Sequence, residues 1–439
     1  MTLSNKKANC GDQIDRISDF PSNVIDGILE HLNIRDRART SILSKKWRYI
    51  WTSFPRLEFD KEFFDLYDGD SDQEDFVDHK PNISRFITEV LLLHNGPIYK
   101  FTLFMHRHFN IKIEFLVKWI LFLSRKGVKH IQLVNNTYQY HSYRMPSHLF
   151  SCQELTHVRI RHFNMSVPPN FRGFKSLLHL HLEQIKFELG ALESLISGCP
   201  LLEELCILNC SGYECVDLSA SPTLKVFHIE YNHAIKSICL EKAKSLIDLT
   251  FIVYRDGVSG LNNILPKVQR LTMGLDSKML YADVIHPTPL ICLKYLKLST
   301  VNLEQREELL HIVSVLKSAS NLVELVMETC CDKDYKTEVP DHAEELDCSS
   351  CCLSQLLTVN IKVKTNFKHV MSLIRFILAN SSSLKTLTLD IDLGYKKSDV
   401  PILFGISRDL LWMERASQRA HVEVLHQRID YDFKDYRYY

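Results

Sequence analysis

Histidine and arginine alternate with apolar residues in two short segments of this sequence. The first runs L-T-H-V-R-I-R from Leu155 to Arg161, and the second runs L-L-H-L-H-L from Leu177 to Leu182. Arginine pairs well with carboxylate and phosphate groups, and histidine titrates close to neutral pH. The chemistry open to these residues is therefore the binding of a target peptide or of a small anion.

A cluster of cysteines is the second group with possible chemistry. Cys330-Cys331 is followed by Cys348, Cys351 and Cys352, and the last three contain one C-x-x-C pair. Such a pair can bind zinc. However, Cys330 occupies a repeat position that favours Asn or Cys, and Cys351-Cys352 open a predicted strand. We therefore expect structural thiols and no metal site.

Catalysis and bulk nucleic-acid binding have little support in the sequence. None of the motifs G-x-S-x-G, H-E-x-x-H, G-x-x-x-x-G-K-[ST] or G-x-G-x-x-G occurs, and only 14 glycines are present in 439 residues. Lys and Arg number 53, as do Asp and Glu, so the formal net charge is zero. We expect a protein that is not an enzyme, requires no cofactor and binds no nucleic acid.

The chain also lacks the features of a secreted or membrane protein. Its amino-terminal residues are polar, and its most apolar run is only about ten residues long and is interrupted by Lys118. A membrane span needs roughly 20 apolar residues. Thirteen cysteines are an odd number and are spread along the chain, which favours reduced thiols. The expected location is the cytoplasm, the nucleus or both, without membrane contact.

A repeat positions the histidines and arginines. Its pattern is an apolar residue, two residues, an apolar residue, one residue and an apolar residue, and copies lie 22 to 34 residues apart. This spacing is typical of leucine-rich repeats. The twelve copies begin at Ile98, Val128, Leu155, Leu177, Leu202, Leu224, Leu246, Val268, Leu293, Leu322, Leu356 and Leu384. Four copies carry the favoured Asn or Cys eight residues later, at Asn136, Cys210, Asn232 and Cys330.

Each copy predicts a short strand with its apolar side chains in a core and the residues between them pointing out. One copy cannot bury its apolar side alone, so stacked copies should form a curved parallel sheet with return helices. The segment from Glu188 to Pro200 predicts one such helix, with Leu192, Leu195 and Ile196 on its apolar face. An ordinary α/β domain is the alternative.

The outward positions should bring five side chains into one inner-face patch, because adjacent strands lie about 4.8 Å apart. Its residues are His157, Arg159, Arg161, His179 and His181. Three interpretations remain open. The patch is a solvated polar surface without a ligand, or its arginines bind a target peptide or small anion, or its histidines hold a metal. The third lacks established zinc spacing.

Residues 14–59 differ from the repeats. Pro21 suits the first turn of a helix, and Asp36 is the expected N-cap of the next one. Two apolar stripes are predicted, Ile25, Ile28, Leu29 and Leu32 in the first helix and Leu43, Trp47, Ile50 and Trp51 in the second. Lys45 and Arg48 point away from the second stripe. These stripes exceed what about 45 residues can bury, which indicates an interface.

This segment resembles the plant-type F-box. The matching residues are Phe20-Pro21, Ile28-Leu29, Leu32, Arg39-Thr40-Ser41, Leu43-Ser44, Trp47-Arg48 and Trp51. Phe20 stands where leucine is usual, which preserves the apolar character. Residues 352–391 and 414–425 are similar to the FBD region that closes many plant F-box/LRR proteins. The chain thus resembles the F-box/FBD/LRR family along most of its length.

The expected fold is α/β, with a helical F-box at residues 14–59, an acidic linker at 60–80 and a leucine-rich-repeat solenoid at 81–345. FBD-like terminal repeats at 346–425 and a tail at 426–439 complete it. The nine acidic residues of the linker favour a solvated connection, and a contact for a basic partner is the alternative.

The resemblance implies a substrate-recognition subunit of an SCF-type ubiquitin ligase. The F-box would dock on a Skp-family adaptor and, through it, on a cullin-RING ligase, while the repeats hold an unknown target protein. The adaptor-binding residues that it implies are Phe20, Pro21, Ile25, Ile28, Leu29, Leu32, Leu43, Trp47 and Trp51. The alternative is a repeat scaffold independent of ubiquitin ligase, in which residues 14–59 only cap the solenoid.

Overall fold

The computed structural model describes most of the chain. The described residues are 17, 20–65, 82–106, 109, 111–137, 143–231, 235–252, 258–259, 261–274, 289–301, 303, 306–329, 353–363, 367–391 and 400–426. They belong to two compact units, Met1–Asn164 and Met165–Tyr439. Asn232, the cysteine cluster from Cys330 to Cys352, most of the predicted linker and the tail beyond His426 lie outside the described residues.

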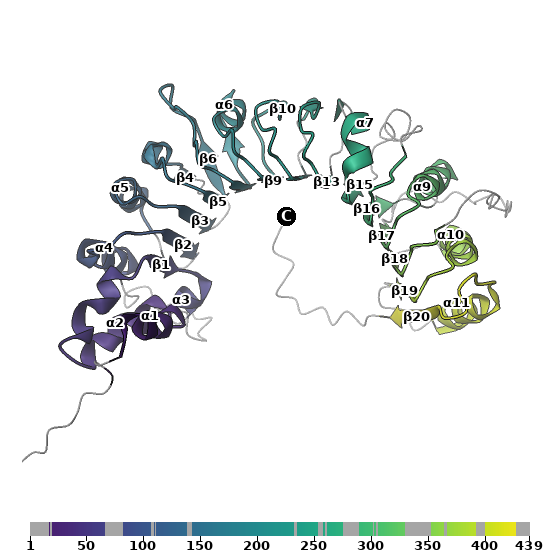
Figure 1. The fold of residues 1–439 in the computed structure, drawn as a ribbon, viewed down its shortest axis with the longest axis horizontal. Coiled ribbons are helices and arrows are strands. Elements are labelled where there is room, and N and C mark those ends of the chain that lie inside the picture. The colour runs from purple at the N-terminus through teal and green to yellow at the C-terminus, as the bar shows by residue number, and fades with distance from the viewer. Residues whose placement is uncertain are drawn as a thin grey trace, which may run out of the picture. The chain divides into compact units, whose positions relative to one another are not determined.

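The first unit begins with short helices and continues into a parallel sheet. Its elements are α1 (Ser22–Glu30), α2 (Ile34–Arg39), η1 (Thr40–Ile42), η2 (Trp47–Ser53), β1 (Arg56–Phe59), α3 (Lys61–Asp65), α4 (Ile83–Leu93), β2 (Lys100–His106), α5 (Ile113–Leu123), β3 (His130–Asn136), β4 (Tyr143–Arg144), η4 (Ser147–Ser151), β5 (His157–Arg161) and β6 (Phe163–Met165). Strands β1, β2, β3 and β5 pair in that order, all in parallel. Helices α4 and α5 lie on one side of these strands (Figure 1).

The second unit repeats one strand and one return segment many times. Its elements are β7 (His179–Glu183), β8 (Lys186–Phe187), α6 (Ala191–Ser197), β9 (Glu204–Leu208), β10 (Cys215–Asp217), β11 (Val226–Glu230), β12 (Ser237–Cys239), β13 (Asp248–Ile252), β14 (Val258–Ser259), α7 (Leu261–Ile264), η5 (Leu265–Lys267), β15 (Arg270–Gly274), β16 (Tyr295–Val301), α9 (Arg306–Ser318), β17 (Glu324–Thr329), β18 (Thr358–Val363), α10 (Phe367–Asn380), β19 (Thr386–Ile391), α11 (Val400–Trp412) and β20 (His421–His426). Helices α6, α9, α10 and α11 lie on the same side of the strands (Figure 1).

The main sheet of the second unit is parallel throughout. Its described strands pair in the order β7-β9-β11-β13-β15-β16-β17-β18-β19-β20. In β9 the apolar positions Leu205 and Ile207 are buried, whereas Glu204 and Leu208 are half-buried. Each of the twelve sequence copies corresponds to a strand, so the predicted repeat sheet is confirmed.

Two strands of this sheet type were not predicted. Strand β1 follows the same spacing, with Phe54, Leu57 and Phe59 at the apolar positions, but these residues also close the predicted F-box. Strand β20 pairs with β19 through Val422 and Val424, and in that register Arg419 stands where the first apolar residue of the pattern would be. Its polar first position hides it from the pattern.

The predicted linker begins inside the core. Residues Lys61–Asp65 form α3, whose Phe63 and Phe64 are fully buried. The Phe63 ring lies 5.4 Å from that of Phe59 and 5.1 Å from that of Phe64, both edge to face. Burial of two phenylalanines outweighs the acidic composition of this stretch. The solvated connection therefore cannot begin before residue 66.

The return segment that was predicted as a helix is α6. Leu192, Leu195 and Ile196 are buried beneath it, as expected. The helix ends at Gly198, whose carbonyl approaches Gly173 so closely that a Cβ on Gly173 would lie 2.2 Å from it. Gly173 also has a φ of +92°, a conformation that favours glycine. This contact sets how closely the return segments pack.

A left-handed residue follows several strands of the second unit. Gln184, Asn209 and Tyr231 have φ values of 53°, 51° and 54°. Their N–H groups donate to the carbonyl oxygens of Leu208, Glu230 and Ile252 in the neighbouring strand, at 2.8 to 2.9 Å. The left-handed conformation costs a non-glycine residue about 1 kcal/mol or more, and the hydrogen bond helps to offset that cost. The same turn thus links successive repeats.

The Asn or Cys position forms a second link. Cys210 is buried, its Sγ accepts from the Ile185 N–H at 3.4 Å, and it lies 3.5 Å from the Leu182 carbonyl. Burial raises the pKa of the Cys210 thiol to about 12. In β3 the linking residue is Asn135, not the predicted Asn136. The Asn135 side chain is the buried one, because strand alternation turns it to the core.

Helix α5 contains the most apolar run of the sequence and lies in the core. Leu116, Trp119, Ile120 and Leu123 are buried along it. The Trp119 ring N–H donates to Thr88 Oγ1 of α4 at 3.0 Å. None of the helices in the described ranges is long and apolar enough to cross a membrane.

We predict that Asn135→Ala destabilises the first unit. The Asn135 amide donates to the His162 carbonyl at 3.0 Å and accepts from the Thr137 N–H at 3.1 Å. Loss of these bonds in a buried site should lower the free energy of unfolding by about 1–3 kcal/mol. Urea denaturation followed by circular dichroism measures this. The matched control is Asn136→Ala, which should change it by less than about 0.5 kcal/mol; equal effects would contradict the assignment.

Candidate functional site

The amino-terminal helices enclose a very small core. It consists of Ile25, Leu29, Trp47 and Phe54, with Leu32 and Ile50 packed at its edge. Three residues predicted to bind an adaptor, Ile25, Leu29 and Trp47, are therefore buried. Their side chains fold the module and are not available to a partner in this conformation.

Other predicted residues are exposed. Phe20, Val24 and Ile28 are exposed. Val24 and Ile28 are four residues apart on one face of α1, because residues at this interval are neighbours on a helix, whereas Phe20 lies just before the N-cap Pro21. We call these three exposed residues the α1 stripe. Pro21 is exposed as well, whereas Leu32 and Trp51 are half-buried. Sequence reasoning missed Val24, although its four-residue spacing from Ile28 was the available signal.

The second predicted stripe does not form on a single helix. Helix η1 ends at Ile42 and η2 begins at Trp47, and between them the Trp47 N–H donates to Ser44 Oγ at 3.3 Å. A serine that bonds to nearby backbone competes with helical hydrogen bonds. As a result Leu43 is 50% exposed while Trp47 is 1% exposed, so they share no face. Ile42 is exposed next to Leu43.

The N-cap of α2 also differs from the prediction. Asn33 precedes the helix in an extended conformation, and its side chain accepts from the Asp36 N–H at 2.9 Å. Asp36 therefore lies in the first turn, where its carboxylate favours the positive end of the helix. It also forms an ion pair with Arg39 at 3.0 Å.

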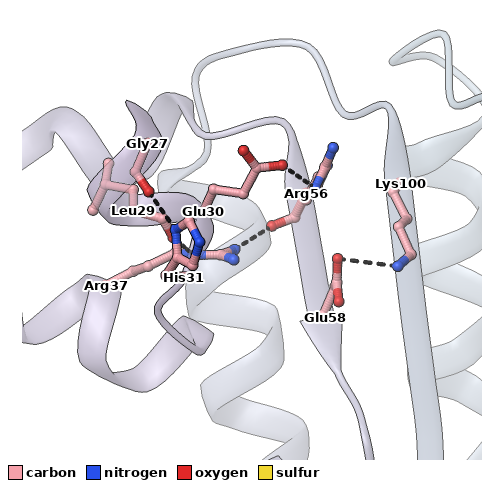
Figure 2. Close-up of polar contacts among 8 residues, drawn as sticks. All are labelled: Gly27, Leu29, Glu30, His31, Arg37, Arg56, Glu58 and Lys100. Carbon is pink, nitrogen blue, oxygen red and sulfur yellow. Dashed lines mark hydrogen bonds and ion pairs between the residues drawn. The ribbon is translucent and has the colours of Figure 1, made fainter. Parts of the chain in front are cut away.

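A buried arginine fastens these helices to the first strand. The Nε of Arg37 donates to the Leu29 carbonyl at 2.7 Å, and its Nη1 donates to the Arg56 carbonyl at 2.8 Å (Figure 2). Its guanidinium carbon lies 4.2 Å from the centre of the Phe54 ring. Burial lowers the pKa of Arg37, and the negative charge of Glu58 opposes this shift. The end of α1 and strand β1 are therefore held by one side chain.

Two ion pairs near the surface also connect α1 to β1 and β1 to β2. Glu30 of α1 pairs with Arg56 at 2.5 Å, and Glu58 pairs with Lys100 of β2 at 3.2 Å (Figure 2). These side chains are between about a quarter and a half exposed, so solvent screens each pair, which contributes at most about 1 kcal/mol. Arg37 is the stronger link, because its bonds are desolvated.

The inner-face patch divides between the two units. In the first unit the His157 ring stacks on His130 with centres 4.0 Å apart, and Arg159 and Arg161 follow on the same strand. Arg159 is exposed, and Arg161 is half-buried. Thr156 Oγ1 lies 2.9 Å from His157 Nδ1. This part of the patch is a stacked histidine pair beside two arginines.

In the second unit His179 and His181 lie close to carboxylates. His179 Nδ1 is 2.9 Å from Glu204 Oε2, and His181 Nε2 is 3.9 Å from Glu183 Oε2. Both histidines are half-buried. That all five residues form one patch remains a prediction, as does their binding of a target.

A further group of polar side chains lies on the main sheet of the second unit and was not predicted. Arg270 Nε lies 3.5 Å from Asp248 Oδ2, and the guanidinium carbon lies 3.9 Å from the centre of the Tyr295 ring. His228 Nε2 lies 3.3 Å from the other Asp248 oxygen. Asp248, Arg270 and Tyr295 are register partners on neighbouring strands, and this lateral alignment was the available signal. The arrangement orients a half-exposed guanidinium, which suits recognition of a carboxylate.

Metal binding finds no support among the residues that the structure describes. No group of three or more His, Cys, Asp or Glu side chains in those ranges could hold a metal ion. The cysteine cluster from Cys330 to Cys352 lies outside them.

Comparison with known proteins gives matches over most of the chain. Residues 17–59 match the F-box domain family. Residues 116–262 match the LRR repeats of the FBD-associated F-box protein At5g56370, and residues 214–403 match the LRR domain of At1g61320/AtMIF1. These matches overlap the amino-terminal module and both units.

Similar proteins occur in Arabidopsis thaliana. The F-box/FBD/LRR-repeat protein At1g13570 is 32% identical, with 94% of this chain and 99% of that protein covered. The putative F-box/FBD/LRR-repeat protein At1g66290 is 27% identical, with 94% and 95% covered. Among solved structures, an internalin, InlF, from Listeria monocytogenes is 12% identical, covers 78% of this chain and 94% of its own, and has a TM-score of 0.34.

We predict that Arg37→Ala destabilises the amino-terminal module. The change leaves the Leu29 and Arg56 carbonyls without their buried donor, which should cost about 1–3 kcal/mol. Hydrogen exchange with mass spectrometry should show faster exchange in α1 and β1. Arg39→Ala is the matched control, because Arg39 is exposed and, among the described residues, its ion pair is with the exposed Asp36; it should cost less than about 1 kcal/mol. Equal protection in both variants would refute the role of Arg37.

Proposed function

This chain belongs to the F-box/FBD/LRR-repeat family of plant proteins, and on that basis we propose that it is the substrate-recognition subunit of an SCF-type ubiquitin ligase. Its F-box docks on a Skp-family adaptor, which connects it to a cullin-RING ligase. The repeat sheet holds a target protein. The chain itself performs no catalysis, since ubiquitin transfer belongs to the other subunits.

The α1 stripe is the observation that carries this proposal. Phe20, Val24 and Ile28 are large apolar side chains that remain exposed beside a core that is already complete. Exposed apolar residues that gather on one face often mark a protein interface. Ile42 and Leu43 add further exposed apolar area after α2. The basic side chains Lys45 and Arg48 are exposed in the same module, which favours a partner with acidic residues around its apolar surface.

The sheet faces support target binding. Short parallel strands present regularly spaced polar side chains, and Arg159 and Arg270 are exposed on them. Arginine recognises carboxylate and phosphate groups in a bidentate manner. We place target recognition on these faces.

The proposed location is the cytoplasm, the nucleus or both. Among the described residues, Cys152, Cys199 and Cys210 are buried and are not joined in disulfides. Burial raises the pKa of each of these thiols to about 12. Buried thiols that form no disulfide favour a reducing compartment.

A second candidate function is a repeat scaffold without a ligase. One observation favours it, since β1 pairs with β2 in parallel and thereby covers one edge of that strand. The amino-terminal module thus protects the sheet, as a cap does. Capping does not require an exposed α1 stripe, so we prefer the ligase receptor.

We predict that Val24→Ser combined with Ile28→Ser weakens adaptor binding. Each change removes apolar surface that the adaptor would bury, and together they should raise the Kd for a purified Skp-family adaptor about tenfold or more. Isothermal titration calorimetry on the full chain measures this. The control is Leu189→Ser, since Leu189 is 97% exposed but lies in the second unit. If the intact chain binds no such adaptor, the ligase proposal is wrong.

We predict that Arg159→Ala combined with Arg161→Ala weakens target capture and leaves adaptor binding intact. The loss of two guanidinium groups removes donors for an acidic target segment. Quantitative mass spectrometry of proteins that co-purify with each variant measures both effects. Arg408→Ala is the control, because Arg408 is exposed on α11. Unchanged target capture would exclude the two arginines from recognition.

A further inference from the structure

Arg270 of β15 is held by a residue on each neighbouring strand, yet part of its guanidinium stays available. Its Nε lies 3.5 Å from Asp248 Oδ2 on β13, and its guanidinium carbon lies 3.9 Å from the centre of the Tyr295 ring on β16. The Arg270 side chain is 54% exposed. None of the described residues forms a hydrogen bond with either Nη group. A planar guanidinium held in this way presents the edge formed by its two Nη groups to a ligand.

Asp248 is occupied on both of its carboxylate oxygens. His228 Nε2 on β11 lies 3.3 Å from Asp248 Oδ1, while Oδ2 faces Arg270. The Asp248 side chain is half-buried, so its contact with Arg270 is partly shielded from water. Arg270 is therefore oriented before a ligand arrives, and binding costs less side-chain entropy than it would for a mobile arginine.

A hydroxyl group and a second cation lie next to Arg270. Thr272 follows two residues later on β15, so both side chains point to the same side of the sheet, away from the core. Thr272 is half-buried, and its hydroxyl has no hydrogen-bond partner in the described part of the chain. Its register partner on β16 is Lys297, whose Nζ pairs with Glu328 at 3.0 Å. The Thr272 hydroxyl is thus available to donate to an anion held by Arg270.

Glu324 of β17 carries a charge of opposite sign in the same row. It is the register partner of Tyr295, and its side chain is exposed. No described residue forms an ion pair or a hydrogen bond with its carboxylate. Strands β15, β16 and β17 are consecutive in the sheet, with α9 on the opposite side (Figure 1). Since adjacent strands lie about 4.8 Å apart, the backbone positions of Arg270 and Glu324 are about 10 Å apart.

We propose that Arg270 and Glu324 form a two-charge site that selects a target segment with one carboxylate side chain for Arg270 and one basic side chain for Glu324. This inference deepens the proposed function and rests on it, because it names the class of target that the repeat sheet holds. The two Nη groups of Arg270 suit one carboxylate, which accepts two parallel hydrogen bonds. Tyr295 lies between the two charges and provides an aromatic surface for the segment that joins them.

The carboxylates around Arg270 decide which anion fits. Asp248 lies on one side of it and Glu324 on the other, and the charge of Lys297 is balanced by Glu328. Like charges repel, so a phosphoryl group with about two negative charges is less favoured here than a carboxylate with one. A run of acidic residues is disfavoured for the same reason. The site therefore selects a segment of mixed charge.

Arrays of short synthetic peptides test the site with the full chain. Each peptide is attached through its carboxyl end, its central residue is fixed as Glu, Gln or phosphoserine, and its other positions are random uncharged residues. The intact chain should bind the Glu peptides about tenfold more strongly than the Gln peptides, because two hydrogen bonds to a charged group are made. In Arg270→Gln this ratio should fall to about one. Arg270→Lys keeps the charge without the paired donors and should give an intermediate ratio.

A second array tests the role of Glu324. It keeps the central Glu and places one Lys at each other position in turn. The best position should raise the signal of the intact chain about threefold, as expected for an exposed ion pair. Glu324→Gln should abolish this gain and keep the preference for Glu over Gln. A gain that persists in Glu324→Gln would overturn the two-charge site.

The matched control is Arg419→Gln, since Arg419 is an exposed arginine of the same unit outside this row. It should keep the full preference for Glu, and thermal melting should show that Arg270→Gln folds like the intact chain. Equal Glu and Gln signals in the intact chain, or an unchanged ratio in Arg270→Gln, would overturn the site. A stronger signal for phosphoserine than for Glu would assign the row to a phosphorylated target and overturn it as well.

Adaptor binding separates this inference from the proposed function. Calorimetry with a purified Skp-family adaptor should give the same Kd for the intact chain and for Arg270→Gln. A chain that prefers Glu peptides but binds no adaptor would remove the ligase proposal and retain the site. A chain that binds the adaptor without any preference for Glu peptides would retain the ligase proposal and remove the site.

Discussion

Lateral hydrogen bonding between very short parallel strands is the constraint on which this structure depends. A strand of five residues, such as β9, buries only the side chains of Leu205, Cys206 and Ile207. It is stable only when a neighbour on each side pairs with its backbone and packs against its buried side chains. The left-handed residue after β7, β9 and β11 repeats the same connection each time. The amino-terminal helices are joined to the sheet in the same way, because the strand that follows them, β1, pairs in parallel with β2.

The repeat strands could be predicted because their information is local. Apolar residues at fixed spacing specify both the strand and its buried side, and no distant contact is needed to read them. The buried role of Arg37 could not be predicted in this way. Its partners Leu29 and Arg56 lie 8 and 19 residues away, and only the folded chain brings their carbonyls to one guanidinium group.

The sequence pattern identifies some of the functional residues correctly and misassigns others. Phe20 and Ile28 could be identified from the F-box pattern, and the structure exposes both. Trp47 belongs to the same pattern but is buried, because its side chain packs against Ile25 and Leu29 in the small amino-terminal core. A sequence motif records residues needed for folding together with residues needed for docking. Burial separates the two sets.

The regular spacing of strands in the main sheet of the second unit has a geometric consequence for any extended segment that crosses these strands. Such a segment advances about 3.3 Å per residue, while the strands lie about 4.8 Å apart, so six of its residues span roughly four strands. Its side chains alternate in direction, and residues six apart therefore point the same way. The return segments vary in length on the other side without altering this ratio. A bound chain would thus meet equivalent positions of the sheet with a period of about six residues, set by backbone dimensions alone.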